Sequence, residues 1–260
     1  MSKRGRYSKS FEGASKLQTV RFGLAGDMHY GSAFCNTKAI TDYYKKAEAF
    51  GADEIFQVGD LLEGDYRHHT PRDLAGHGFD EQAAIAQRLL PVSLPTTFIV
   101  GNHDETFGHT GQHPGTAFVD RLRAGGRHRI QCIGDRRGFV KHHGVKICLF
   151  HPSFGCAKAN AMGVSPTRLA PTSKLEQFLC AVKDSHDPDI VAVGHWHQSA
   201  YFLYRGMHVL LTGAFQNPQG SFSNSLASDP AVGSWLVEVE LTKRGRKKTV
   251  TPKWLDYGRG

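Results

Sequence analysis

The chain has 260 residues, of which 40% are hydrophobic and 22% are charged, and its formal net charge is +8. This composition excludes wholesale disorder, and no apolar run reaches the roughly 18 residues that a membrane-spanning helix needs. The five cysteines (Cys35, Cys132, Cys148, Cys156 and Cys180) are widely spaced and form no Cys-x-x-Cys pair, which is typical of reduced thiols. No apolar stretch follows the basic N-terminus, so we expect a cytoplasmic protein without a secretory signal.

Strands and helices are expected to alternate along the chain. In the first 150 residues we predict, in this order, a strand at 21–26, a helix at 36–50 with Asn36 as its N-cap, a strand at 54–59, a helix at 79–90, a strand at 96–100, a helix at 116–123 and strands at 129–133 and 145–150. The capping box Ser173-x-x-Glu176 then predicts a helix that runs to about Val182, and further strands are expected at 189–194, 201–204, 207–212 and 235–241. The alternation favours an α/β fold with parallel strand pairs, while the close spacing of the strands after Asp189 predicts antiparallel pairing.

Five predicted strands are each followed at once by Asp, Asn or His. The segments are Asp27-x-His29, Gly59-Asp60, Gly101-Asn102-His103-Asp104, His151 and Gly194-His195-x-His197. A single Gly-Asp after a strand is usually only a turn, but ligands of open α/β sheets bind at the carboxyl ends of the strands. In an extended segment, alternate residues point the same way, so each x-spaced pair can reach one site.

The chemistry of these side chains predicts a metal centre. Mixed carboxylate, imidazole and amide ligands suit Mn²⁺, Fe²⁺ or Zn²⁺ better than Ca²⁺ or Mg²⁺. Seven candidate ligands exceed what one tetrahedral zinc ion takes, so they suit two metals that share a bridging carboxylate.

The five segments, in this order, resemble the motifs of the calcineurin-like metallophosphoesterase superfamily, and the resemblance covers about residues 20–215. It implies a four-layer α/β/β/α sandwich of two mixed sheets flanked by helices, with a dimetal site at the carboxyl ends of the strands. It assigns Asp27, His29 and His197 to the first metal, Asn102, His151 and His195 to the second, and Asp60 to the bridge between them.

The same resemblance implies a mechanism and a cofactor. His103 corresponds to the family's catalytic histidine, and we expect Asp104 to hold it and to favour its protonated form. Two divalent ions, Mn²⁺ first with Fe, Zn or Ni as alternatives, would provide a bridging hydroxide that attacks phosphorus. His103 would stabilise the added negative charge or protonate the leaving group.

Two features of the sequence indicate which members of the superfamily the chain resembles. In residues 59–64 (Gly-Asp-Leu-Leu-Glu-Gly), Glu63 stands where members that act on phosphoserine and phosphothreonine proteins usually carry a second Asp, and the following Arg is absent. We therefore expect no protein-phosphatase role. Residues 26–32 are more similar to bacterial, archaeal and phage members labelled DNA-repair exonucleases, and the stretch 151–235 is more similar to phage and prophage members, whose substrates are mostly unassigned.

The remaining histidines and several loop residues leave alternatives open. Histidines in glycine-rich loops could rim the site, but we expect exposed loop positions for His68, His69, His77, His109 and His113. We expect structural or exposed positions for His128, His142, His143, His186 and His208. Base stacking or ordinary loop packing would suit Tyr66, Phe107 and Phe154, and phosphate binding or solvation would suit Lys158 and Arg168.

The basic charge lies at the two ends of the chain. The first 21 residues carry +5 and the last 20 carry +6, which leaves −3 for the residues between them. We expect a basic N-terminal tail at 1–20, the metallophosphoesterase domain at 21–242 and a basic C-terminal segment at 243–260. The ends are either solvated tails or a grip on nucleic acid.

Three functions follow from these features. The first is a metal-dependent phosphodiesterase that acts on DNA or RNA. The second is a phosphatase or pyrophosphatase of nucleotides or other small phosphate compounds. The third is a non-catalytic interaction module on the same fold, which the complete ligand set disfavours. A phosphate-ester substrate is the expected partner, and no membrane is.

Overall fold

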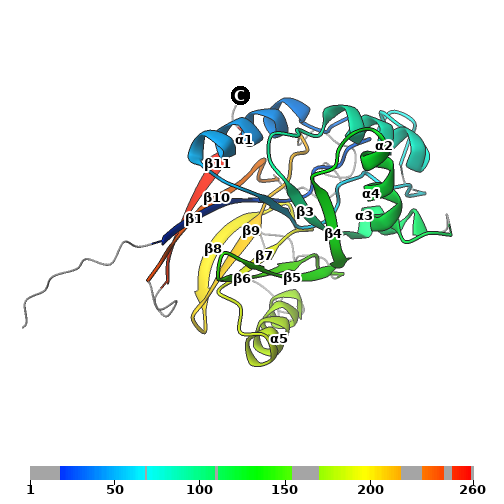
Figure 1. Cartoon of the computed structure of the whole chain (residues 1–260). Helices are drawn as coiled ribbons and strands as arrows, with labels where there is room; N and C mark the ends of the chain where they lie inside the picture. Colours follow the sequence, from blue (N-terminus) through cyan, green and yellow to red (C-terminus); the bar gives the residue numbers. More distant parts are fainter. Residues whose placement is uncertain are drawn as a thin grey trace, which may run out of the picture.

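The computed structural model describes residues 18–67, 69–108, 111–153, 170–217, 230–242 and 248–258, without the side chains of 170–173 and 248. Within these residues the strands form two sheets that lie face to face, and helices cover their outer sides (Figure 1). The first sheet has the order β11-β10-β1-β2-β3-β4. Its strands are β1 (Gln18–Ala25), β2 (Ile55–Gln57), β3 (Thr96–Val100), β4 (Ile130–Asp135), β10 (Gly233–Leu241) and β11 (Lys248–Asp256).

Parallel pairing dominates the centre of each sheet. β1, β2, β3 and β4 are parallel, whereas β10 is antiparallel to both β1 and β11. The second sheet has the order β5-β6-β7-β9-β8, in which β6, β7 and β9 are parallel and the edge strands β5 and β8 are antiparallel to their neighbours. Its strands are β5 (Arg137–His142), β6 (Val145–Phe150), β7 (Ile190–Val193), β8 (Ser199–Tyr204) and β9 (Met207–Thr212).

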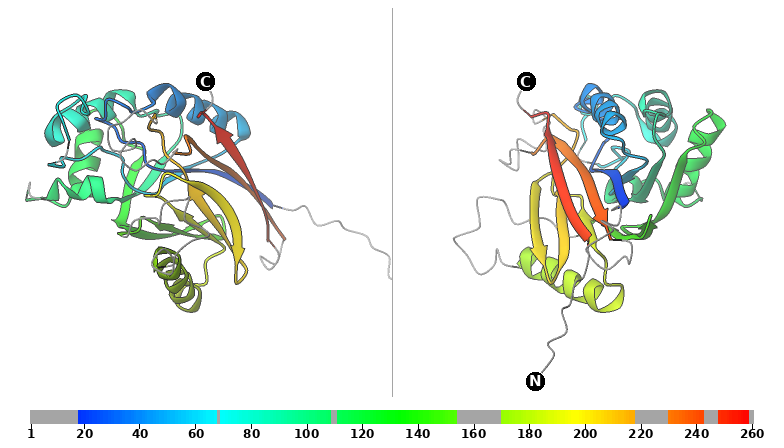
Figure 2. Two further views of the ribbon diagram at one scale, coloured as in Figure 1. Left: turned by 180° about the vertical axis from the view of Figure 1, so that it is seen from behind. Right: turned by 60° about the vertical axis from the view of Figure 1, so that its left-hand side comes forward.

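The helices lie on opposite outer faces of the two sheets (Figures 1 and 2). Three of them cover the first sheet: α1 (Thr37–Phe50), α2 (Gly78–Leu89) and α4 (Pro114–Ala124). The short α3 (Asn102–Glu105) directly follows β3, and α5 (Ala170–Ser185) covers the second sheet. The layers are therefore α/β/β/α, as the resemblance implied.

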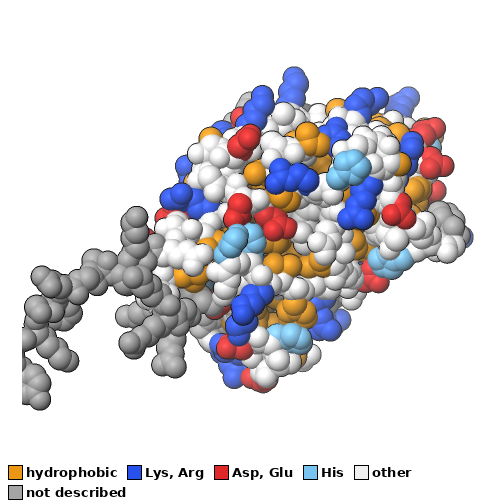
Figure 3. Space-filling view, in the orientation of Figure 1, with side chains coloured by type: hydrophobic (Ala, Val, Ile, Leu, Met, Phe, Trp, Pro, Cys, Tyr) orange, Lys and Arg blue, Asp and Glu red, His pale blue; other side chains and the backbone are white. Residues whose placement is uncertain are grey.

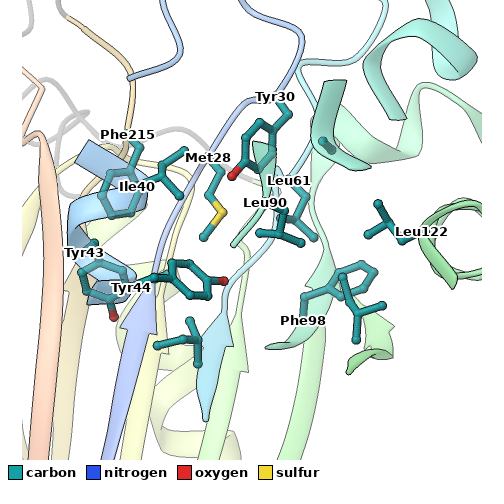
Figure 4. Close-up of a cluster of buried hydrophobic side chains, with 14 of the residues drawn as sticks. Met28, Tyr30, Ile40, Tyr43, Tyr44, Leu61, Leu90, Phe98, Leu122 and Phe215 are labelled. Carbon is teal, nitrogen blue, oxygen red and sulfur yellow. The ribbon is translucent and has the colours of Figure 1, made fainter. Parts of the chain in front are cut away.

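Buried side chains fill each interface between these layers. On the helix side of the first sheet, one cluster of buried side chains extends from Tyr43 and Tyr44 of α1 through Phe98 of β3 to Leu122 of α4 (Figure 4). The alternate residues Phe22 and Leu24 of β1 point the other way, into the core between the sheets. A third cluster joins α5 to the second sheet. Three such interfaces among the described residues are what a four-layer sandwich requires.

Local signals explain where several elements begin and end. The Asn36 side chain accepts a hydrogen bond from the backbone N–H of Ala39 at 3.0 Å, which confirms the predicted N-cap of α1. Gly51 ends the same helix in the left-handed conformation at φ 83°. By contrast, α5 starts at Ala170, before Ser173, so the predicted capping box does not begin that helix.

The predicted pairing after Asp189 is right only in part. β8 and β9 form an antiparallel hairpin, but β9 lies parallel to β7 and β10 belongs to the other sheet. Short spacing indicates a hairpin only where the turn permits one, and the two-residue turn Arg205-Gly206 does so with φ values of 48° and 82°. Spacing alone could not show that β9 lies between β7 and β8.

Three elements were absent from the sequence-based prediction. No element was predicted at α3 or β5, and β11 lies within residues 243–260, which we expected as a separate basic segment. β1 likewise begins at Gln18, inside the expected N-terminal tail. The first sheet thus extends past both predicted limits of the domain, 21 and 242. None of the helices in the described part of the chain is both long and apolar enough to cross a membrane.

Candidate metal centre

The seven predicted ligands converge where strands of the two sheets end. β1, β2 and β3 of the first sheet precede Asp27, Asp60 and Asn102, while β6 and β7 of the second sheet precede His151 and His195. Backbone bonds join the loops, because Met28 and His29 both donate to the carbonyl oxygen of Asp60, at 2.9 and 3.0 Å. The face-to-face packing of the sheets therefore brings together residues that are far apart in the sequence.

One group of donors consists of Asp27, His29 and His197, whose ligand atoms lie within 4.8 Å of one another. The Nε2 atoms of His29 and His197 are 3.1 Å apart. Both carboxylate oxygens of Asp27 accept a hydrogen bond from the backbone N–H of His195, at 3.1 and 3.0 Å, which fixes that carboxylate. Asp27 is fully buried and His29 is 1% exposed. The group thus offers one oxygen and two nitrogens to a single point.

A second group consists of Asp60, His151 and His195, also within 4.8 Å. The Nε2 atom of His151 lies 2.8 Å from Oδ1 of Asn102 and 3.1 Å from Oδ2 of Asp60. Its Nδ1 lies 2.7 Å from the carbonyl oxygen of Val58, and a carbonyl only accepts, so the ring carries its proton there. Nε2 is then the nitrogen that faces the other donors, which is the usual way a ligating histidine is oriented.

Sharp turns, rather than extended backbone, aim these side chains inward. Four ligand residues have left-handed backbones: His29 (φ 52°), Asp60 (φ 54°), His195 (φ 75°) and His197 (φ 52°). This conformation costs about 1–2 kcal/mol for a residue with a Cβ atom. Our expectation that the two x-spaced pairs converge is confirmed, but the extended geometry that we gave as its reason is wrong.

Glycines allow the ligand loops to approach each other. A Cβ atom on Gly101 would lie 2.2 Å from Oδ1 of Asp60, and one on Gly59 would lie 2.6 Å from Nδ1 of His151. Gly59 also has a φ of 96°, in the region that favours glycine. The glycines of the Gly-Asp and Gly-Asn-His-Asp segments are therefore required by the packing of the loops after β2 and β3.

Burial and neighbouring charges shift the pKa values of the cluster in different directions. Burial raises the pKa of Asp27 to about 7, against the opposing charge of His151. Burial also acts on Asp60, but His151 and His103 outweigh it and hold the pKa of that carboxyl well below its usual range. Burial lowers the pKa of His195 to about 4 and that of His197 well below its usual range. These two rings are therefore neutral, as metal ligands must be.

The donor set fits a transition-metal cation. The Nε2 atoms of His29 and His197 face each other beside the carboxylate of Asp27. Imidazole nitrogens with carboxylate and amide oxygens are the ligands that such ions take. The bridging position is also available, because Asp60 belongs both to the group with His151 and to a group with His29.

Glu63 supports the first group of donors, which the sequence did not reveal. Its Oε2 atom lies 2.8 Å from Nδ1 of His29, although the angle is not that of a hydrogen bond, and it accepts from Nε2 of Gln216 at 2.9 Å. Its Oε1 atom lies 3.3 Å from Nε2 of His69. Burial opposes ionisation of Glu63, but His29 outweighs it and lowers the pKa of Glu63 to about 2. Only the departure from the family motif at this position could have drawn attention to it.

His103 lies beside the donors, but Asp104 does not hold its ring. The ring Nδ1 of His103 donates to the carbonyl oxygen of Glu63, and burial, ahead of all charges, lowers the pKa of His103. Asp104 instead accepts from the backbone N–H groups of Leu61, Leu62 and Gly101, at 3.3, 2.8 and 2.9 Å. The expectation that Asp104 holds the His103 ring is therefore wrong, and burial works against the protonated form of His103. As the third residue of α3, Asp104 turns back toward the backbone, where it joins the loops after β2 and β3.

The structure also places the residues for which alternatives were open. Tyr66 accepts from Nδ2 of Asn102 at 2.9 Å and donates to its carbonyl oxygen at 3.0 Å, which directs the Asn102 amide oxygen toward His151. Phe107 is 2% exposed and packs in the core, so it stacks on no base. The expected exposure of His69 is wrong, because its side chain is 7% exposed. His77, His113, His128, His143 and His186 are exposed as expected, while His142 and His208 are partly buried. The remaining candidates lie outside the described residues: His68, His109, Phe154, Lys158 and Arg168.

Comparison with known proteins defines the class. A model of the calcineurin-like phosphoesterase superfamily domain matches residues 20–228. The chain therefore belongs to the calcineurin-like phosphoesterase superfamily, whose members are generally metal-dependent. No curated protein matches the chain.

Solved structures with a similar fold share little sequence with this chain. An archaeal phosphodiesterase is 14% identical, with a TM-score of 0.43 over 90% of this chain and 100% of its own. A predicted phosphoesterase from Streptococcus pneumoniae is 12% identical, with a TM-score of 0.43 over 91% of this chain and 99% of its own. Vps29 from Entamoeba histolytica, in complex with Zn²⁺, is 15% identical, with a TM-score of 0.39 over 90% and 99%.

Proposed function

We propose that this protein is a phosphodiesterase that depends on two divalent metal ions and acts on nucleic acid. The observation that carries the proposal is the meeting of two donor groups, Asp27/His29/His197 and Asp60/His151/His195, at one edge of both sheets. Asn102 completes the second group through its amide oxygen, and Asp60 lies between the groups. Mn²⁺ is the first candidate, with Fe, Zn or Ni as alternatives, because the ligands are a mixture of imidazole and oxygen donors.

The side chains of the site would hold the metal ions, exchange a proton with the reacting phosphate ester and fix the loops that carry these groups. When bound, two divalent ions neutralise phosphate charge and lower the pKa of water. His103 carries its ring proton on Nδ1, at the Glu63 carbonyl, so its Nε2 is the atom that takes up or gives a proton. Its lowered pKa keeps the ring neutral near pH 7, which suits exchange of a proton with a leaving group or water. Asp104 and Tyr66 position the loops that carry these groups.

The preference for nucleic acid is supported by the sequence rather than by a basic surface. Residues 1–21 carry +5 and residues 241–260 carry +6, and the motifs resemble members labelled exonucleases. On the face in Figure 3, the Lys and Arg side chains of the described residues are interspersed with Asp and Glu instead of forming one stripe. Attraction of a polymer would therefore depend on the metal centre and on the ends of the chain.

A substrate series with Mn²⁺ tests this proposal. We would compare a bis-aryl phosphate, an aryl monophosphate, nucleotides, and single- and double-stranded DNA and RNA. Hydrolysis of the diester and of a nucleic acid, with poor turnover of monoesters, is the expected result. Preferential turnover of the monophosphate or of a nucleotide would replace the nuclease with a phosphatase of small compounds. Metal binding without any hydrolysis would favour a non-catalytic interaction module.

A further inference from the structure

A second cluster of metal-ligating side chains lies at the opposite ends of the strands. Asp53, His142 and His143 each offer one ligand atom, and these atoms lie within 4.8 Å of one another. Asp53 precedes β2, whereas the candidate metal centre follows that strand. His142 ends β5, and His143 forms the turn that leads into β6. The cluster thus lies between the two sheets, at the end of β2 and β6 opposite to the candidate metal centre.

One carboxylate faces both imidazoles in this cluster. Oδ1 of Asp53 lies 2.7 Å from Nε2 of His142, and Oδ2 lies 3.0 Å from Nε2 of His143. Zinc ligands at about 2.0–2.1 Å from a tetrahedral ion are about 3.3 Å apart, so the three side chains need to separate only slightly to admit an ion. His143 and Asp53 can make this adjustment, because their side chains are 54% and 47% exposed.

His142 is held in a ligand's orientation by its surroundings. A Glu54 carboxylate oxygen lies 3.4 Å from its Nδ1, on the side away from Asp53. Phe22 and Phe56 pack edge-on against the ring at centroid distances of 5.8 and 5.1 Å, and its side chain is only 10% exposed. The Nε2–H of His142 donates to Asp53, and Glu54 can accept the ring proton at Nδ1 when Nε2 binds a metal instead. Glu54 is itself held by the hydroxyl of Thr97.

We propose that Asp53, His142 and His143 form a second, peripheral site for a divalent transition metal such as Zn²⁺. Two imidazoles and one carboxylate are a protein ligand set that zinc takes, with water in the fourth position. The solvent exposure of two ligands gives the ion a path of entry. An ion here would link the segment before β2 in the first sheet to the β5–β6 turn in the second, and so connect the two sheets at this end.

The number of ions bound by the full chain tests the proposal. We would measure Zn²⁺ per chain by equilibrium dialysis and elemental analysis for the unmodified protein and its variants. His143→Asn removes the imidazole but keeps the turn, because His143 and Gly144 have φ values of 46° and 90° and Asn-Gly is a preferred sequence for such a turn. Arg205→Asn places the same Asn-Gly sequence in the β8–β9 turn and is the matched control.

The unmodified protein and Arg205→Asn should bind one more ion per chain than His143→Asn, and Asp53→Asn should lose the same ion. In a crystal soaked with Zn²⁺, anomalous scattering should place that ion about 2.0–2.1 Å from Nε2 of both histidines. The proposal is wrong if His143→Asn and Asp53→Asn bind as many ions as the control. Because the readout is an ion count, its outcome is independent of whether the protein hydrolyses phosphate esters.

Discussion

His103 lies among the predicted metal ligands, but its predicted role is proton transfer. Its ring lies 4.6 Å from that of His29 and 4.7 Å from that of Tyr66, measured between centroids, so it is part of the site. Its pKa is lowered by burial, and its Nδ1 proton is engaged by a backbone carbonyl. Nε2 is therefore the ring nitrogen of His103 that is available to exchange a proton.

Replacing His103 with Gln should therefore separate turnover from metal binding. We expect kcat to fall by about 10²–10⁴-fold, the usual contribution of general acid–base catalysis, with the number of bound ions unchanged. Steady-state kinetics on a bis-aryl phosphate and elemental analysis of the same sample measure both quantities. Full activity in the variant would exclude His103 from the reaction.

Glu63 should instead act on metal affinity through His29. Because its carboxylate lies 2.8 Å from Nδ1 of His29, Glu63→Gln removes the charge that orients and polarises this ligand. Loss of such a supporting group typically costs about 10–100-fold in metal affinity. Competition of the protein with a chelator would measure the change, and Glu48→Gln on the exposed face of α1 is the control. Equal affinities in the two variants would show that Glu63 only fills space.

At the scale of elements, the loops after β2 and β3 form one unit. Asp104 of α3 accepts backbone bonds from both loops, and Gly101 lies against the Asp60 carboxylate. These loops carry no apolar periodicity from which a helix or strand can be predicted. The strands before them were therefore predicted better than the loops. β3, β6 and β9 match their predicted ranges, because residues rich in Val, Ile, Leu and Phe form them and Gly or Pro precedes each strand.

Gly101→Ala tests the close approach of these two loops. Gly101 has φ −98° and ψ −176°, which any residue adopts, so the effect of the methyl group is steric. The methyl group would lie 2.2 Å from Oδ1 of Asp60, and such overpacking costs about 1–3 kcal/mol of unfolding free energy. Urea unfolding should show this loss, and competition with a chelator should show weaker metal binding. Gly108→Ala, whose added carbon would meet nothing closer than 4.0 Å, should change neither.

Other parts of the site could not be predicted from single positions. The family resemblance implied that Asp104 holds the His103 ring, yet the first turn of α3 directs Asp104 to the backbone. Glu63 contacts the His29 ligand, and His69 and Gln216 contact Glu63, through long-range packing that no local pattern encodes. β5 was missed because exposed residues interrupt it, and β11 because it begins at the end of the basic run 243–248 and contains Pro252.

At the scale of the whole molecule, the candidate metal centre joins the two sheets. Asp27 and Asp60 come from strands of the first sheet, and His151 and His195 come from strands of the second. Buried carboxylates and imidazoles at this junction compensate one another only in part, as their divergent pKa values indicate. Bound cations would therefore stabilise the sandwich as well as supply chemistry.

Removal of metal should lower the melting temperature. An ion present at 100 times its dissociation constant contributes about 2.7 kcal/mol, and 1 kcal/mol corresponds to about 2–4 °C for a domain of this size. We thus expect a decrease of roughly 5–11 °C after dialysis against a chelator, reversed by Mn²⁺. Scanning calorimetry measures this shift. Identical melting curves with and without the chelator would show that the donors hold no ion.

The most direct test of the account is metal content and diesterase activity measured together for Asp60→Asn. Asp60 belongs to the group with His151 and to a group with His29, and His151 keeps its carboxylate ionised, so the amide should fail to bridge two ions. We predict that the unmodified protein binds two ions in this centre and hydrolyses a bis-aryl phosphate, and that the variant loses at least one ion and at least about 10²-fold of the activity. An Asp60→Asn protein with unchanged ion content and unchanged hydrolysis would contradict a metal-dependent reaction at this site.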